Sequence, residues 1–261
     1  MKKKCRSTVQ TRYYQSYNDD FVKSSNQDFE LPDNYIWINN SIWHRLASAF
    51  VYLLGLIFSF CYCRLYLHIK IKNRAILKRF KKSGCFLYAN HTQPLGDAFI
   101  PGRVITPKRS YIVAGTANLG IPLLGRFLPL LGALPVPDSI GGLKKLHQAI
   151  GQRVMTGNCI VIYPEGHVWP WYTGIRPYST ASFSYPVAYH APSFCMTATY
   201  QQRKYRKRPK MTIYLDGPFY PDRQLSKKAQ KELLRKDIHN CMIKRSSNSY
   251  SEYIRYLKGG T

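Results

Sequence analysis

The stretch Cys85-Phe-Leu-Tyr-Ala-Asn-His91-Thr-Gln-Pro-Leu-Gly-Asp97 joins a short apolar run to a polar turn. Residues 85–89 are apolar or aromatic and predict a buried strand. The sequence Gln93-Pro94-Leu95-Gly96 fits a type I turn, with proline at its second position. If the chain folds back at this turn, Asp97 reaches the His91 imidazole and orients it as a general base. Two simpler interpretations stay open: Asp97 only caps a helix, or His91 is an ordinary loop histidine.

Strands and helices are predicted to alternate along the rest of the chain. Apolar runs predict strands at residues 111–114, 159–163, 194–200 and 210–215. Helical spacing of apolar residues predicts helices at 140–154, 181–189 and 225–244. This alternation predicts an α/β fold, with a mixed, mostly parallel sheet flanked by helices.

A second polar cluster, Pro164-Glu165-Gly166-His167, follows the strand predicted at 159–163. Open α/β sheets place their ligand sites at the carboxyl ends of strands. The next segment, 169–178, is rich in aromatic residues and contains one cation, Arg176. An arginine among aromatic side chains suits bidentate phosphate binding. A cation–π contact at the surface is the alternative interpretation.

The chain is strongly basic, with 39 Lys and Arg against 13 Asp and Glu and a formal net charge of +26. This excess indicates a polyanionic partner, either a nucleic acid or an anionic membrane. The seven cysteines are an odd number, and Cys61-Tyr-Cys63 lacks the spacing of a zinc pair. We therefore expect a reducing compartment, no disulfide framework and no metal.

An uncharged segment of eighteen residues lies between Arg45 and Arg64. Its length is about the minimum for a membrane span, and Trp37 and Trp43 precede it like an interfacial belt. Three arrangements remain open: a crossing helix, a helix lying in the interface plane, and a helix buried against the catalytic domain. Basic residues after the segment favour a cytoplasmic location for the domain that follows. Residues 71–82 predict a basic amphipathic helix along the membrane surface.

The two polar clusters together carry a family resemblance. Asn90-His91-Thr92 with Asp97, followed by Pro164-Glu165-Gly166, resembles the motifs of the glycerolipid acyltransferases, over roughly residues 70 to 220. That family acylates lysophosphatidic acid and related lysophospholipids. The resemblance implies transfer of an acyl chain from acyl-CoA or acyl carrier protein to a lysophospholipid hydroxyl, with 1-acylglycerol 3-phosphate as the expected acceptor. It implies no cofactor besides that thioester co-substrate.

The fourth family motif is weak, because Pro192 is present but Cys195-Met196-Thr197 lacks the expected second proline. The sequence also departs from the family pattern in three other places. Five residues separate His91 from Asp97, where the family has four. The family's glycine-rich second motif falls at 132–138, and Asp138 replaces its arginine. The Thr-Arg pair that follows Glu-Gly in the family is His167-Val168 here, which leaves Arg176 as the nearest cation. These departures indicate a divergent subfamily.

The resemblance assigns roles and boundaries. His91 is the expected general base and Asp97 its orienting acid. The expected substrate-binding residues are Asn90, Glu165, Gly166, His167 and Arg176. We expect a polar N-terminal segment at 1–34 that is poorly ordered or peripheral, a membrane-contacting helical region at 35–82, an acyltransferase domain at 83–244 and a peripheral tail at 245–261.

Two alternatives differ in function class. A basic nucleic-acid-binding protein would explain the charge and the aromatic segment with Arg176. It would not explain the apolar helix or the two strand-end motifs, so nucleic acid is the disfavoured partner and an anionic phospholipid membrane the expected one. A non-catalytic, membrane-binding relative of the acyltransferases is the second alternative.

Overall fold

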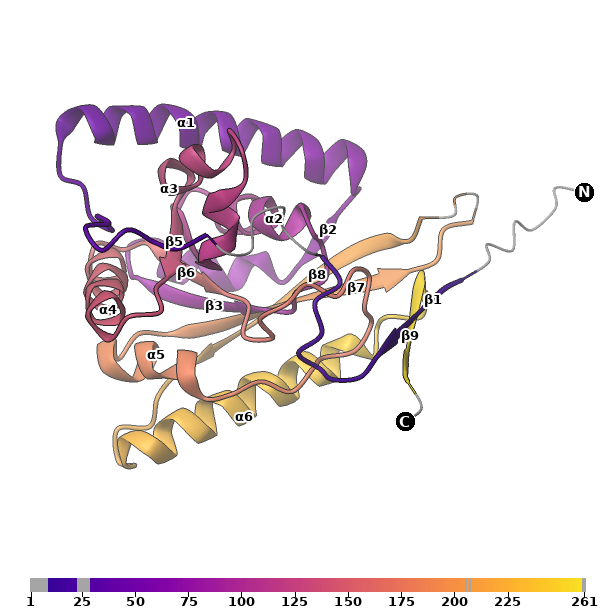
Figure 1. Ribbon diagram of the computed structural model, residues 1–261. Helices are drawn as coiled ribbons and strands as arrows, with labels where there is room; N and C mark the ends of the chain where they lie inside the picture. The colour runs from indigo at the N-terminus through magenta and orange to yellow at the C-terminus, as the bar shows by residue number, and fades with distance from the viewer. Residues whose placement is uncertain (1–8, 23–28, 205, 207, 260–261) are drawn as a thin grey trace, which may run out of the picture.

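The computed structural model describes residues 9–22, 29–204, 206 and 208–259. A seven-stranded sheet forms its centre (Figure 1). In spatial order the strands are β2 (Lys70–Lys72), β8 (Lys210–Phe219), β7 (Ser193–Gln201), β3 (Cys85–Ala89), β6 (Cys159–Ile162), β4 (Ser110–Gly115) and β5 (Ala133–Val136). Only β7 and β8 pair in antiparallel fashion, and all other neighbours are parallel. The predicted mixed, mostly parallel sheet is confirmed.

Helices cover both faces of this sheet. On one side lie α1 (Ile42–Cys61), α2 (Gly96–Ile105) and α3 (Leu128–Leu131), and on the other α4 (Ile140–Met155), α5 (Ser184–Tyr189) and α6 (Lys227–Ser246) (Figure 1). Each face therefore has its own apolar core. Strands β3, β6 and β7 are buried along their whole length, and the sequences of β3 and β6 are accordingly apolar throughout.

Helix α1 has an unusual distribution of side chains. Its two buried residues are serines that face the protein: Ser48 Oγ donates to Leu130 O at 2.8 Å, and Ser59 Oγ donates to Phe99 O at 2.7 Å. A Cβ at Gly55 would lie 2.6 Å from Leu131. The opposite face exposes large apolar side chains, among them Phe50 and Leu54. The segment Ile42–Tyr66 is apolar and long enough to cross a membrane, with a mean hydropathy of 2.0, so α1 is the expected candidate membrane-contacting helix.

The two ends of the described chain pair with each other. Strand β1 (Gln10–Tyr14) runs parallel to β9 (Ile254–Lys258) in a separate two-stranded sheet. The N-terminal strand is therefore not poorly ordered, and the peripheral placement expected for both ends stays a prediction, since this sheet is separate from the central one. Pairing between segments some 240 residues apart leaves no local pattern in either one. Residues 1–8 and 23–28 of the N-terminal segment lie outside the described residues.

The helix expected at 71–82 is also partly wrong. The segment begins as strand β2 beside β8, and a 3-10 helix follows over Arg74–Phe80. Asn73 lies between them with a φ of 61°, a left-handed conformation that an α-helix cannot contain. The strand depends on a distant partner, so its short sequence gives no signal of its own.

Candidate active site

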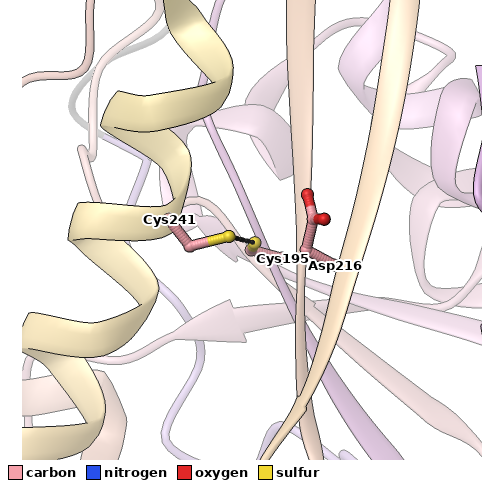
Figure 2. Close-up of side chains that lie close together, drawn as sticks. All are labelled: Cys195, Asp216 and Cys241. Carbon is pink, nitrogen blue, oxygen red and sulfur yellow. Dashed lines mark hydrogen bonds between the residues drawn. The ribbon is translucent and has the colours of Figure 1, made fainter.

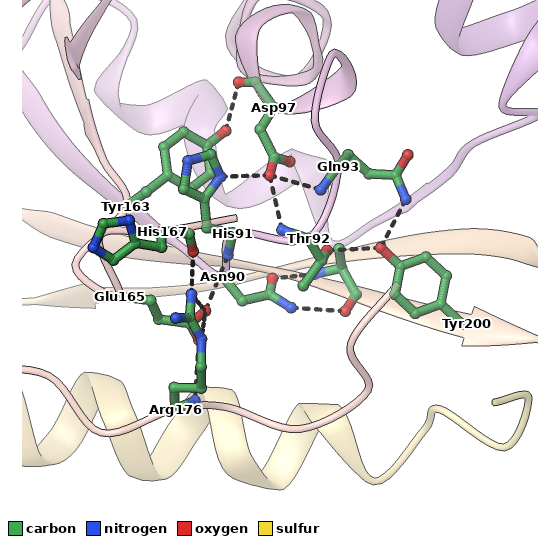
Figure 3. A network of polar contacts seen from close by, with 11 residues as sticks. Asn90, His91, Thr92, Gln93, Asp97, Tyr163, Glu165, His167, Arg176 and Tyr200 are labelled. Carbon is green, nitrogen blue, oxygen red and sulfur yellow. Dashed lines mark hydrogen bonds and ion pairs between the residues drawn. The ribbon is translucent and has the colours of Figure 1, made fainter. Parts of the chain in front are cut away.

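His91 and Asp97 meet just beyond the carboxyl end of β3 (Figure 3). The Nδ1 atom of His91 lies 2.7 Å from Asp97 Oδ2. The same carboxylate oxygen accepts hydrogen bonds from the main-chain amides of Thr92 at 2.8 Å and Gln93 at 2.9 Å. A carboxylate with three donors is held in one position, and its contact with Nδ1 places the imidazole proton on that nitrogen. The Nε2 atom is then the basic nitrogen of the ring.

The turn after His91 brings the acid back to the base. The amide of Asp97 donates to Gln93 O at 3.0 Å, and α2 begins at Gly96. Asp97 thus lies in the first turn of α2, where the helix dipole favours a negative charge. The five intervening residues fit because this turn absorbs them. The interpretation of Asp97 as only a helix cap is wrong, because Leu95 holds the N-cap position and the Asp97 carboxylate accepts from amides that precede the helix.

Two buried tyrosines that the sequence did not indicate hold this loop. The Tyr163 hydroxyl donates to the main-chain oxygen of Asp97 at 2.6 Å, and its ring stacks on His91 with centroids 4.3 Å apart. The Tyr200 hydroxyl lies 2.6 Å from Thr92 Oγ1 and accepts from Gln93 Nε2 at 3.0 Å. Burial raises the pKa of both phenols well above the usual value, so both stay neutral. Tyr163 directly precedes the Pro164-Glu165-Gly166 cluster, which was the only sequence signal for its role.

The imidazole remains accessible while its partner is enclosed. The His91 side chain is 19% exposed and that of Asp97 is 4% exposed. Among the described residues, none forms a hydrogen bond with His91 Nε2. A substrate hydroxyl can therefore approach this nitrogen, with the acid shielded behind the ring.

Glu165 lies below the loop and forms a buried ion pair with Arg176. The Arg176 Nη2 atom is 3.1 Å from Glu165 Oε2, and both side chains are fully buried. Burial raises the pKa of Glu165, and the guanidinium of Arg176 opposes that rise. Glu165 Oε2 also accepts from the His91 amide at 3.3 Å (Figure 3). The ion pair thus supports the main chain that carries His91.

The terminal nitrogens of Arg176 also bond to main-chain oxygens. Its Nη1 donates to Tyr17 O at 2.9 Å, and its Nη2 donates to His167 O. This arrangement does not favour the expectation that Arg176 binds a phosphate, because no donor faces solvent. The sequence could not indicate this, since Tyr17 comes from the distant N-terminal segment.

The other expected binding residues fall into two groups. Asn90 is buried, where its side chain bonds both the amide and the carbonyl of Ala198 on β7, at 2.8 and 3.1 Å. It joins β3 to β7 and does not face a ligand in this conformation. Gly166 and His167 are exposed on the loop after β6. Gly166 has a φ of 78°, and no atom lies within 4 Å of a Cβ built there, so this part of the loop is open to a ligand.

An aromatic cluster formed by both chain ends packs around Trp169, in the loop after β6. Trp169 is completely buried, and its indole Nε1 donates to Asp19 O at 2.8 Å. Rings from the N-terminal segment and from β9 surround it, namely Tyr14, Tyr17, Phe21 and Tyr256. The β1–β9 sheet is therefore part of the scaffold that holds the 165–176 loop.

One group of side chains has the composition of a metal site. Cys195 on β7, Asp216 on β8 and Cys241 on α6 offer ligand atoms within 4.8 Å of one another (Figure 2). Asp216, however, already binds Arg245 through both oxygens, at 2.8 and 2.5 Å. Structural zinc sites have four ligands. The cluster does not argue for a metal, and the absence of one from the protein stays a prediction.

Comparison with known proteins adds the family. Residues 68–193, which contain both strand-end motifs, match the family model described as Acyltransferase. This match, over just under half of the chain, identifies an acyltransferase domain at residues 68–193. This confirms the resemblance drawn from the motifs around His91 and Glu165.

A solved structure is similar to this chain over most of both chains. It is the crystal structure of PlsC, the 1-acyl-sn-glycerophosphate (LPA) acyltransferase from Thermotoga maritima, with a TM-score of 0.55. The match covers 82% of the present chain and 86% of PlsC at 13% sequence identity. At this identity the similarity shows a common fold. No curated protein sequence matches the chain.

Proposed function

We propose that this acyltransferase transfers a fatty acyl chain from a thioester to the hydroxyl of a lysophospholipid, with 1-acylglycerol 3-phosphate as the expected acceptor in phospholipid biosynthesis. The observation that carries the proposal is the His91–Asp97 pair, with Nδ1 bound to the acid and Nε2 accessible. The family match and the fold shared with PlsC, an LPA acyltransferase, support the class of acceptor.

The proposed chemistry begins with proton removal. His91 Nε2 accepts the proton of the acceptor hydroxyl as its oxygen attacks the thioester carbonyl. Asp97 stabilises the imidazolium that forms. When the tetrahedral intermediate collapses, the carbon–sulfur bond breaks and the imidazolium returns its proton to the departing thiolate. The products are the acylated lipid and the free thiol of coenzyme A or of acyl carrier protein.

The binding surface for the acceptor is proposed at the open part of the loop after β6. Gly166 and His167 are exposed there, and the His167 side chain is 46% exposed. Glu165 and Arg176 act below it as positioning residues, because their charged groups bond to each other and to the main chain.

Membrane contact is proposed through α1. The helix is anchored to the protein by Ser48 and Ser59 and directs its apolar face outward. This orientation supports a helix lying in the interface of an anionic membrane rather than one that crosses it. The excess of Lys and Arg would strengthen binding to anionic lipid. We expect the catalytic domain to lie on the cytoplasmic side.

The test is product identification. Purified protein is incubated on anionic vesicles with a panel of lysolipids and with labelled acyl-CoA or acyl carrier protein, and the lipid products are identified. The proposal predicts a diacyl product from a lysophospholipid with at least one of the two donors. Vesicle binding without any acylated product would instead support the non-catalytic alternative.

A further inference from the structure

The guanidinium groups of Arg109 and Arg153 both lie over the ring of Tyr111, at the end of the sheet opposite the active site. The guanidinium of Arg109 lies 5.2 Å from the centre of the Tyr111 ring, and that of Arg153 lies 4.7 Å from it. Ser110, at the start of β4, is level with Cys159 on β6, and Cys159 is level with Cys85 at the start of β3. Because these strands are parallel, the arginines lie at the amino ends, whereas His91 follows the carboxyl end of β3.

These arginines have no acidic partner in the described part of the chain. The ion pairs found there involve other residues. Arg109 donates through Nη2 to Ser48 Oγ at 2.5 Å and Leu130 O at 2.7 Å. The Nε atoms of Arg109 and Arg153 are both buried without a hydrogen-bond partner. Buried donors on cations are normally paired, so both atoms require an acceptor.

A cavity of about 190 Å³ adjoins the two side chains. This volume is several times the roughly 30 Å³ that one water molecule takes in the liquid. Helix α1 contributes His44 and Arg45 to its lining, and Asn39 comes from the segment before α1. No aspartate or glutamate is among the described residues that line it. The cavity thus combines three guanidinium groups with space for a small anion.

We propose that this cavity is a binding site for a phosphate group. Arginine forks match the geometry of phosphate oxygens, and three arginines, Arg45, Arg109 and Arg153, line the cavity without a lining acid to neutralise them. The phosphate can belong to a membrane lipid headgroup or be free in solution. The cavity lies beside the start of α1, where Trp43 and Leu46 are exposed, so a headgroup could bind there with its acyl chains along the apolar face of α1.

The site does not depend on the proposed reaction, because it lies at the amino ends of the strands, whereas His91 follows the carboxyl end of β3. It would hold one lipid while a different molecule reacts at His91. A phosphate at this site would also fix α1 to the domain, since Arg109 already contacts Ser48 of that helix. Occupancy is therefore expected to stabilise the folded protein.

The experiment is a thermal melt and a calorimetric titration of the full chain with two probes. One probe is inorganic phosphate, compared with chloride at equal ionic strength. The other is a short-chain phosphatidic acid below its micellar concentration, compared with diacylglycerol of the same chain length, which lacks the phosphate. We expect phosphate-containing anions to raise the melting temperature, with saturation at one equivalent. Tighter binding of phosphatidic acid would assign the site to a headgroup, and equal affinity would assign it to free phosphate.

Variants locate the binding. Arg153→Met and Arg109→Met should each weaken binding at least tenfold, whereas Arg223→Met, on an exposed loop, should leave it unchanged. Arg109 packs against α1, so Arg153→Met is the decisive variant if Arg109→Met fails to fold. The proposal is overturned if neither anion binds the wild type, if diacylglycerol binds as well as phosphatidic acid, or if Arg153→Met binds like Arg223→Met. Acyl transfer by Arg153→Met on neutral vesicles should stay at the wild-type rate, so failure here is distinguishable from failure of the proposed reaction.

Discussion

The carboxylate of Glu165 accepts a hydrogen bond from the main-chain amide of His91 at 3.3 Å, and this contact joins the two polar strand ends. Arg176 holds the same carboxylate from below, and the main chain of Tyr17 holds Arg176. The position of His91 therefore depends on a buried ion pair and, through it, on the N-terminal segment.

Loss of one partner of this ion pair should strongly destabilise the fold. Arg176→Met leaves the Glu165 carboxylate buried without its counter-charge, which should lower the free energy of unfolding by about 3–5 kcal/mol. Urea denaturation measures the change. The double variant Glu165→Gln, Arg176→Met should be less destabilised than the sum of the two single variants.

The pH dependence of that variant follows from Glu165. Burial raises the pKa of Glu165 and Arg176 opposes the rise, so without Arg176 the folded state binds a proton more readily than the unfolded state. Stability of Arg176→Met should therefore be greatest below the ordinary pKa of glutamate, about 4.3, and fall as the pH rises. The control is Arg255→Met, which removes an exposed pair with Glu252 and should change stability by less than about 1 kcal/mol. Equal losses for the two variants would contradict the role given to Arg176.

Tyr200 should make the protein sensitive to alkaline pH. Burial raises the pKa of its phenol, so above pH 10 the unfolded chain loses a proton that the folded chain keeps. Stability should then fall with pH by up to about 1.4 kcal/mol per unit for this group. Tyr200→Phe should give a shallower slope, and Tyr220→Phe, on the surface, should not. Denaturation at several pH values from 9 to 11 measures the slopes, and parallel slopes for the two variants would refute the prediction.

The terminal sheet should contribute to stability through Trp169. Truncation to alanine would leave a large cavity among Tyr14, Tyr17 and Tyr256 and should lower the free energy of unfolding by about 3–5 kcal/mol. Trp43, which is 78% exposed, provides the matched control, and Trp43→Ala should stay within about 0.5 kcal/mol of the wild type. A small effect of Trp169→Ala would mean that the chain ends do not hold the 165–176 loop.

Exposed apolar residues of α1 should determine vesicle binding. Phe50 and Leu54 project from the face that does not contact the protein, and each should contribute about 1.5–3 kcal/mol when buried in lipid. Phe50→Ser, Leu54→Ser should therefore weaken binding to anionic vesicles at least tenfold in a sedimentation assay. The control Ile243→Ser alters an exposed apolar residue of α6, on the other side of the sheet, and should bind normally. Unchanged binding by the double variant would exclude α1 as the contact.

The sequence predicts those features whose signals are local. The apolar run at 85–89, the turn at Pro94 and the acid at Asp97 lie within thirteen residues, so the strand and the His91–Asp97 pairing follow from one short stretch. Helix α4 likewise has its signals nearby, with Ser139 as its N-cap, accepting from Gly142. These elements appear in the structure where the pattern predicts them.

Features that depend on distant partners could not be predicted in this way. Strands β1 and β9 exist because each completes the other, and β2 exists because it lies beside β8. The contacts of Arg176 could not be predicted for the same reason, because Tyr17 and Glu165 approach it only in the folded chain. A pattern of aromatic residues around an arginine does not reveal whether its donors face a ligand or the protein.

The most direct test is the rate of acyl transfer by His91→Ala in the purified protein. Loss of a general base should reduce kcat by about 10²–10⁴-fold, while the circular dichroism spectrum and melting temperature stay close to those of the wild type. The matched control is His190→Asn, which changes an exposed histidine in a left-handed conformation that asparagine accepts, and it should keep full activity. Thioester-dependent acylation by folded His91→Ala at a rate near that of the wild type would contradict the proposed mechanism.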